Sequence, residues 1–213
     1  MNDRERQMRG LLAALFTAFV IHAAAAAERW QTLPPTPPPV SGATTGYAEV
    51  NGIRLYFATI GSGPPVVLLH GGLANSNYWG HQVQALAPAH KVILVDSRGH
   101  GRSTAVDKPY SIAMLAEDAL AILDQLGIDG AHFCGLSKGG MVGQWLATHH
   151  GARLNRVVLA NTGARMGPPE LWNSRIRAGR RDGMAGLVQP TLGRWLTQAF
   201  PVRDTATGAQ VRA

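Results

Sequence analysis

The sequence predicts an α/β fold with a mostly parallel sheet and flanking helices. Four short apolar runs without alternation, at residues 66–69, 92–95, 131–134 and 157–160, are typical of strands buried on both faces of a parallel sheet. Helical patterns lie between them, and this alternation implies βαβ units with right-handed crossovers. The 213 residues, 46% of them apolar, fit one globular domain and exclude a disordered chain.

The N-terminus predicts a targeting segment. Three arginines precede an apolar run at residues 11–21, which is followed by alanines 23–27 and Glu28. This layout is typical of a secretory signal peptide over residues 1–27. We expect an exported protein, periplasmic or secreted, with no stable membrane span after cleavage. An N-terminal membrane anchor is the alternative, although the run reaches the ~20 residues of a span only by including His22 and the alanines.

A proline-rich linker, residues 28–46, is expected to separate this segment from the core. Residues 33–41 contain five prolines, which favour an extended chain. We expect the α/β core over residues 47–167. Asn51-Gly52 is a strong hairpin signal, and the residues that follow it, 53–59, alternate with the period of a strand.

The middle of the chain predicts a helix and then a sharp turn. Ser111 is expected to cap a helix that ends at Gly127. The strand at residues 131–134 then leads into Gly135-Leu136-Ser137-Lys138-Gly139 and the helical stretch 140–149. A strand-to-helix turn this sharp strains the serine backbone and crowds its neighbours, so glycine is needed on both sides.

This G-x-S-x-G pattern predicts that Ser137 is a catalytic nucleophile, held out at the carboxyl end of the sheet. The backbone N–H of Lys138 would point at a developing oxyanion. A serine in an ordinary turn is the alternative.

His70-Gly71-Gly72 follows the strand 66–69, where a second oxyanion donor is needed. We expect Gly72 to supply it, with Leu73 as the runner-up. A glycine-rich strand exit without a catalytic role is the alternative. We interpret His70 as a structural residue.

Three segments, in this order, resemble the α/β-hydrolase superfamily. They are Leu68-Leu69-His70-Gly71-Gly72, Asp96-Ser97-Arg98-Gly99-His100-Gly101-Arg102-Ser103 and Gly135-Leu136-Ser137-Lys138-Gly139-Gly140. Residues 133–200 resemble the 3-oxoadipate enol-lactonase branch more closely, through Gly139-Gly140-Met141-Val142-Gly143-Gln144-Trp145-Leu146, Val158-Leu159-Ala160-Asn161-Thr162 and Pro169-Glu170-Leu171-Trp172-Asn173.

The resemblance implies an α/β-hydrolase fold with a structural loop at residues 96–103 and a partial helical cap at residues 168–203. Leu73, Trp172 and Trp195 are candidates for lining the substrate pocket. Core packing is the alternative for the two tryptophans.

The resemblance also implies a triad in the chain order serine, acid, histidine, and the chain does not complete it. After Ser137 the only histidines are His149 and His150, which we expect about 18 Å away along the helix that follows the nucleophile. Asp182 falls in the cap region and Asp204 beyond it. We therefore expect a C-terminally truncated fold, with residues 204–213 as an unassigned tail.

The function predicted is that of a serine hydrolase of carboxylic esters or lactones that works through an acyl-enzyme. If the lactonase resemblance holds, the substrate is an enol-lactone of aromatic catabolism. The alternative is a catalytically inactive pseudoenzyme or binding fragment that lacks the triad acid and histidine.

A disulfide scaffold and a zinc module are excluded, because Cys134 is the lone cysteine and no Cys/His pair has zinc-site spacing. The predicted function implies no metal or organic cofactor. The net charge of +7 comes from ten scattered arginines against three acidic residues in residues 152–213. Scattered arginines favour a solvated surface, so we expect no nucleic-acid partner. The predicted function implies a small-molecule ester or lactone as substrate. The oligomeric state stays open.

Overall fold

The computed structural model describes residues 40–197. The expected signal peptide, most of the expected linker and the expected tail lie outside these residues. The described part falls into two compact units, residues 40–166 and residues 167–197. None of the helices in this part has the length and hydropathy needed to cross a bilayer.

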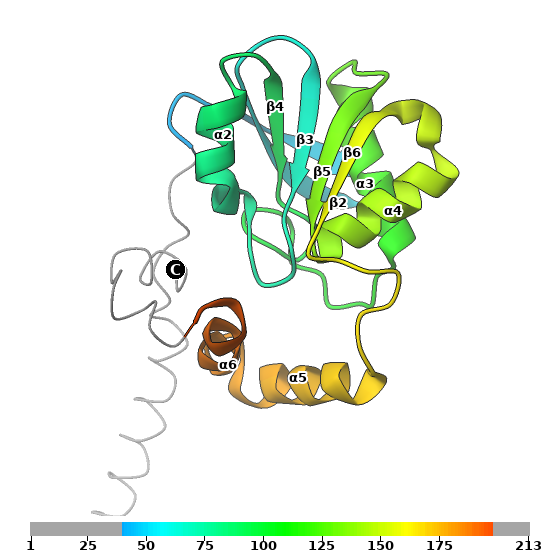
Figure 1. The fold of residues 1–213 in the computed structure, drawn as a ribbon. Coiled ribbons are helices and arrows are strands. Elements are labelled where there is room, and N and C mark those ends of the chain that lie inside the picture. Colours follow the sequence, from blue (N-terminus) through cyan, green and yellow to red (C-terminus); the bar gives the residue numbers. More distant parts are fainter. Residues whose placement is uncertain (1–39, 198–213) are drawn as a thin grey trace, which may run out of the picture. The chain divides into compact units, whose positions relative to one another are not determined.

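The first unit is built on a six-stranded sheet with the order β1-β2-β4-β3-β5-β6 (Figure 1). Strand β2 pairs antiparallel with β1 and β4, whereas the four strands from β4 to β6 are parallel. The mostly parallel sheet predicted from the sequence is therefore confirmed. The strands are β1 (Thr44–Val50), β2 (Ile53–Ile60), β3 (Pro65–Leu69), β4 (Lys91–Val95), β5 (Ala131–Leu136) and β6 (Leu154–Ala160).

Helices cover both faces of this sheet (Figure 1). On one face lie η1 (Ser76–Trp79) and α2 (Gly80–Leu86), and on the other lie α3 (Ile112–Gln125) and α4 (Lys138–His149). The short η2 (Gly151–Arg153) leads from α4 into β6.

Buried side chains of β3 alternate between two apolar clusters, one on each face of the sheet. Val66 and Leu68 pack in the cluster that contains Val83 of α2. Val67 and Leu69 pack in the cluster that contains the buried residues of α3 and α4. The unalternated apolar run in the sequence therefore has the predicted cause, burial on both faces.

The hairpin starts earlier than expected. Strand β1 begins at Thr44, so three residues assigned to the linker belong to the fold, because Thr44 and Thr45 pair with Thr59 and Ala58 of β2. The turn itself is as predicted: Asn51 has a φ of 50° and Gly52 a φ of 76°, both in the left-handed region that this turn requires.

The second unit contains two helices, α5 (Pro169–Asp182) and α6 (Ala185–Trp195), joined at Gly183. Pro169 suits the first position of α5 because its missing N–H would have no partner there. Gly183 has a φ of 64°, which lets the chain turn between the helices. Two helices in this segment match the expected start of a helical cap.

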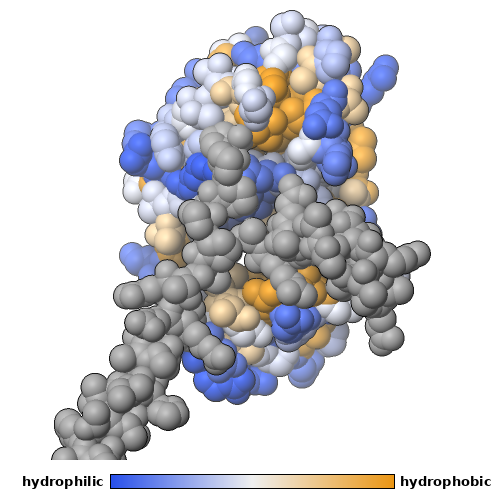
Figure 2. Space-filling view, turned by 90° about the vertical axis from the view of Figure 1, so that its left-hand side faces the viewer, coloured by the Kyte–Doolittle hydropathy of each residue, from blue (hydrophilic) through white to orange (hydrophobic). Residues whose placement is uncertain are grey.

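Strand β6 is an edge of the sheet among the described residues. Val157, Val158 and Leu159 are 36%, 58% and 43% exposed. A cavity of about 280 Å³ lies on the α2 side, lined by residues that include Leu68, Leu86 and Val158. Figure 2, viewed from the side of α2, shows apolar surface among the polar residues there. Strand β6 and the α2 side of the sheet therefore expose apolar side chains to solvent.

A buried ion pair ties the loop after β4 to α3. Arg98 donates from Nε and Nη2 to the two carboxylate oxygens of Asp118, both at 2.6 Å. The two side chains are 5% and 4% exposed. On the same helix, Asp124 pairs with Arg153, where the side chains are 61% and 27% exposed.

We predict that Asp118→Ala lowers the free energy of unfolding by about 3–5 kcal/mol, because it leaves the Arg98 guanidinium buried without a counter-charge. Asp124→Ala is the matched control and should cost less than about 1 kcal/mol, as solvent-exposed pairs do. Urea denaturation of both variants measures the difference. Equal, small losses would contradict the prediction.

Candidate functional site

Ser137 occupies a strained turn between β5 and α4. Its backbone has a φ of 53° and a ψ of −111°, a conformation that costs a non-glycine residue about 1–3 kcal/mol. Two contacts hold it: the Ser137 N–H donates to the Ala160 carbonyl at 2.8 Å, and Thr162 Oγ1 donates to the Ser137 carbonyl at 2.7 Å. The predicted strand–turn–helix setting is confirmed.

The glycines beside the serine are required by close backbone contacts. A Cβ on Gly135 would collide with the backbone of Gly139. A Cβ on Gly139 would collide with the carbonyl of Leu69, the last residue of β3. The glycines therefore let the turn lie against the neighbouring strand, as the sequence pattern predicts.

The loop after β3 lies next to Ser137. A Cβ on Gly71 would be 3.3 Å from Ser137 Cβ, whereas a Cβ on Gly72 would have open space around it. Leu73 is 40% exposed and has a φ of 61°, which is an outlier for a bulky side chain. Lys138 begins α4, so its backbone N–H has no acceptor within the helix.

His70 is buried and both ring nitrogens are engaged with the backbone. Nδ1 donates to the Gly71 carbonyl at 2.6 Å, and Nε2 accepts from the Ser97 N–H at 3.0 Å. Burial, with the nearby charges of Lys138 and His100, lowers the pKa of His70 to about 3. His70 is thus a neutral structural link between two loops, as expected from the sequence.

The loop 96–103 is also held in place by hydrogen bonds. The buried Asp96 carboxylate accepts from the backbone N–H of Ser76 at 2.7 Å and of Arg102 at 2.8 Å. Ser103 Oγ donates to the Asp96 carbonyl and accepts from the Tyr56 N–H. The structural role implied by the resemblance is confirmed.

The Lys138 side chain reaches this loop, a contact that sequence reasoning missed. Its Nζ lies 3.3 Å from His100 Nε2, and His100 Nδ1 donates to the Arg98 carbonyl at 3.0 Å. Burial lowers the pKa of Lys138 to about 7. Burial, and then the charge of Lys138, lowers the pKa of His100 to about 4.

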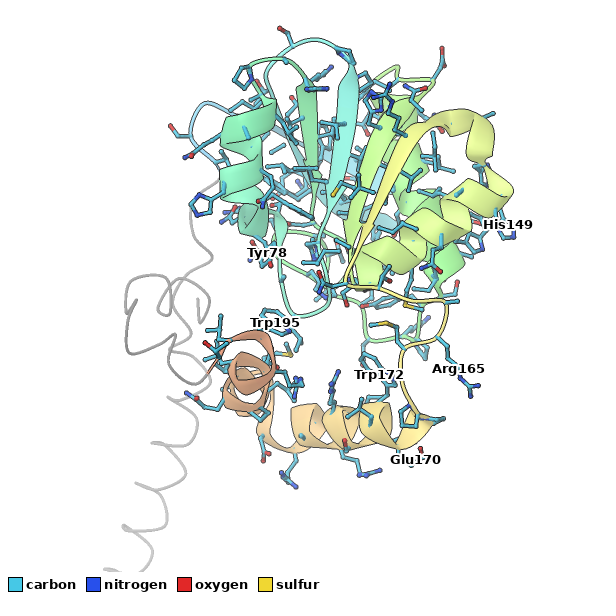
Figure 3. All side chains as sticks on the ribbon, in the orientation of Figure 1. Tyr78, His149, Arg165, Glu170, Trp172 and Trp195 are labelled. Atoms are coloured by element: carbon cyan, nitrogen blue, oxygen red, sulfur yellow. The ribbon has the colours of Figure 1, made fainter. Side chains whose placement is uncertain are left out.

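The remaining candidates do not gather at Ser137. His149 stacks on Trp145 at the outer end of α4 (Figure 3), and both His149 and His150 are exposed. Asp182 pairs with its neighbour Arg181, and Asp204 lies outside the described residues. Within residues 40–197, no Asp–His pair is bonded to Ser137.

The two tryptophans named as pocket candidates belong to the second unit. Trp172 is 39% and Trp195 45% exposed, so neither is packed in an apolar core. The Arg175 guanidinium lies 4.7 Å from the centre of the Trp172 ring. Figure 3 shows Trp172 and Glu170 on opposite sides of α5.

We predict that replacing Ser137 by glycine raises the free energy of unfolding by about 1 kcal/mol relative to Ser137→Ala. Both variants lose the hydroxyl, but glycine alone relieves the strained backbone, which more than offsets its entropic cost. Thermal unfolding of the pair measures the difference. A glycine variant less stable than the alanine variant would argue against strain at this turn.

We also predict that the free energy of unfolding falls as the pH is lowered from 6.5 to 4. In this range histidines of the unfolded chain take up protons, whereas His70 and His100, with folded pKa values of about 3 and 4, do not. The unfolded state then binds more protons and is favoured. Urea unfolding should show a shallower pH dependence for His100→Asn, while the exposed control His149→Asn keeps the slope of the parent. Identical slopes in all three proteins would overturn this assignment.

Comparisons with known proteins agree with this geometry. A family described as the alpha/beta hydrolase fold matches residues 64–201. The 3-oxoadipate enol-lactonase 2 of Acinetobacter baylyi is 38% identical over 150 residues, which are 70% of this chain and 56% of that protein. These similarities confirm the resemblance expected from the motifs.

Two solved structures extend the comparison. The enol-lactonase from Burkholderia xenovorans LB400 has a TM-score of 0.76 and 40% identity, and the match covers 78% of this chain and 66% of that chain. Est816, an N-acyl homoserine lactone degrading enzyme, has a TM-score of 0.66 and 29% identity, with 78% and 64% covered. The chain thus spans a little over half of the curated relative and about two thirds of each structure.

Proposed function

Because this chain belongs to the α/β-hydrolase fold family, we propose that it is a serine hydrolase of carboxylic esters or lactones. The observation that carries the proposal is the strained backbone of Ser137 at the turn from β5 to α4, beside the glycines that follow β3. Strained residues that are held in place by many contacts cluster at active sites. A serine in this setting presents its hydroxyl at the carboxyl end of the sheet.

In the proposed reaction, Ser137 Oγ attacks the carbonyl carbon and gives its proton to a base. The backbone N–H groups of Gly72 and Lys138 bind the oxyanion that develops on the carbonyl oxygen. The ester or lactone C–O bond then breaks, and the leaving oxygen takes a proton. Water hydrolyses the acyl-Ser137 ester and regenerates the hydroxyl.

The substrate proposed is an enol-lactone of the kind named in the relatives. Two of the most similar proteins are enol-lactonases, and a third acts on N-acyl homoserine lactones. A lactone of aromatic catabolism is therefore the substrate class that we favour, with Leu73, Trp172 and Trp195 as candidate pocket residues.

A second candidate function depends on whether a general base is available to take the proton of Ser137 Oγ. His70 and His100, which the structure brings to the loops near Ser137, are bonded to backbone groups. Within the described residues no histidine is hydrogen-bonded to the Ser137 hydroxyl, and a serine hydroxyl without a base is a weak nucleophile. A base from outside residues 40–197 would complete the hydrolase, and without one the chain would be a binding protein that keeps the pocket.

We also propose that the protein is exported, to the periplasm or beyond. The support is the order of basic, apolar and small residues over residues 1–27. An N-terminal membrane anchor is the alternative for the same segment.

We predict that a fluorophosphonate probe labels the whole chain at Ser137, as the hydroxyl oxygen displaces fluoride from phosphorus. Ser137→Ala should abolish labelling, while Ser174→Ala, at an exposed serine of α5, should leave it unchanged. If the chain supplies no base of its own, added imidazole should accelerate labelling of the parent but not of Ser137→Ala. In-gel fluorescence and mass mapping of the labelled peptide give the readout.

Thermal unfolding first shows that each protein is folded. Folded parent protein that stays unlabelled, with and without imidazole, would refute the serine hydrolase and favour the binding protein. Labelling that persists in Ser137→Ala would show that a residue other than Ser137 reacts with the probe.

A further inference from the structure

The peptide group between Ser137 and Lys138 is held from its carbonyl side. The Ser137 carbonyl accepts two hydrogen bonds, from Thr162 Oγ1 at 2.7 Å and from the Met141 N–H at 3.1 Å. The bond from Met141 is the usual first bond of a helix, whereas Thr162 is 25 residues away in the sequence. A peptide group is planar, so a contact that fixes the direction of its C=O also fixes the direction of its N–H.

The N–H of this peptide group is the one that the proposed function assigns to the oxyanion. It belongs to Lys138, the first residue of α4, and therefore has no acceptor within the helix. In a trans peptide the C=O and the N–H point in opposite directions. The Thr162 hydroxyl thus holds the peptide group from behind, while the N–H is directed away from it.

The chain after β6 brings Thr162 to this carbonyl. Asn161 has a φ of 46°, in the left-handed region that asparagine visits more readily than most residues, and it turns the chain directly after the end of β6 at Ala160. A Cβ on Gly140 would lie 2.6 Å from Thr162 Cγ2 and 3.0 Å from Thr162 Oγ1. Thr162 is therefore packed closely against the first turn of α4, where Gly140 leaves room for it.

The hydrogen bond from Thr162 also makes the N–H a stronger donor. Hydrogen bonds that are linked in a chain polarise one another. Here the chain would run from the Thr162 hydroxyl through the peptide group to the oxyanion. The gain is greatest in the transition state, because negative charge develops on the carbonyl oxygen there.

We propose that Thr162 is a positioning residue, whose hydroxyl orients and polarises the peptide group that binds the oxyanion through the Lys138 N–H. This inference rests on the proposed function, because it assigns a supporting residue to the same site. Thr162 acts through the peptide group and not on the substrate. Loss of its hydroxyl should therefore slow the chemical step and leave reversible binding unchanged.

The test compares Thr162→Val with Thr162→Ser in the full chain. Valine has the shape of threonine without the hydroxyl, whereas serine keeps the hydroxyl. Thr148→Val is the matched control, because Thr148 Oγ1 also donates to backbone carbonyls of α4, those of Gln144 and Trp145. The probe is a fluorophosphonate: Ser137 Oγ bonds to phosphorus, fluoride and the hydroxyl proton leave, and the phosphoryl oxygen becomes more negative during this step.

Labelling rates at increasing probe concentration separate the dissociation constant of the reversible complex from the rate constant of the covalent step. Thr162→Val should lower the rate constant roughly 10-fold, less than the roughly 100- to 1,000-fold of a deleted oxyanion donor, because the donor remains but is less well directed. The dissociation constant should not change. Thr162→Ser should restore the rate constant of the parent, and Thr148→Val should not alter it. If valine prevents folding, Thr162→Ala removes the same hydroxyl and should give the same loss.

Nuclear magnetic resonance of the free protein reports on the peptide group whether or not the serine reacts. The resonances of the Ser137 carbonyl carbon and the Lys138 amide proton should shift in Thr162→Val towards weaker hydrogen bonding and return in Thr162→Ser. Folded parent protein that shows these shifts but is not labelled would refute the hydrolase and still support the orienting role of Thr162. An unchanged covalent rate constant in Thr162→Val, equally slow labelling of Thr162→Ser, or unshifted resonances would overturn the proposal.

Discussion

The arrangement of the site depends on one constraint, the positive φ of Ser137. A serine does not adopt this conformation unless the contacts around it outweigh the strain. Here the Ala160 carbonyl, the Thr162 hydroxyl and two tightly packed glycines supply them. Because Gly139 packs on the end of β3, the same constraint brings the loop 70–73 against the serine. The proposed nucleophile and the loop proposed to bind the oxyanion are thus positioned by a single packing arrangement.

Buried polar groups complete this arrangement by joining loops that are far apart in sequence. His70 joins the exits of β3 and β4, Asp96 organises the loop that follows β4, and Arg98 anchors that loop to α3. Each of these groups is hydrogen-bonded to specific partners, so it fixes the relative positions of the loops that it joins. Lys138 differs from them, because its histidine partner cannot neutralise its charge.

Local patterns in the sequence predict much of this structure. The Asn51-Gly52 turn, the Ser111 cap, which accepts from the Met114 N–H at 3.1 Å, and the turn at Ser137 each depend on a few neighbouring residues. Helix α2 and strand β1 are not evident from periodicity, because α2 buries only Val83 and β1 buries only Ala48. Their structure comes from packing and pairing partners elsewhere in the chain.

The features that could not be predicted are those that depend on distant contacts. The strand order depends on the crossover connections between the parallel strands, and spacing along the chain does not encode it. The same connections bring Lys138 close to His100, which is 38 residues away in the sequence. Thr162 is a further example, since a threonine after a strand carries no signal that its hydroxyl will hold the Ser137 carbonyl. The pocket candidates Trp172 and Trp195 rest on the resemblance alone, and the described structure gives them exposed positions.

The anchoring of Ser137 on the end of β6 affects how long its strained backbone conformation lasts. Among residues 40–197, β6 is an edge strand that ends at Ala160, and Thr162 follows it. Both contacts that hold the serine backbone therefore depend on a strand that is paired on one side within these residues. Edge strands open by local fluctuations that need less free energy than global unfolding. The lifetime of the strained turn is then set by the opening of β6 rather than by the stability of the core, and any chain that adds a strand to this edge would prolong it.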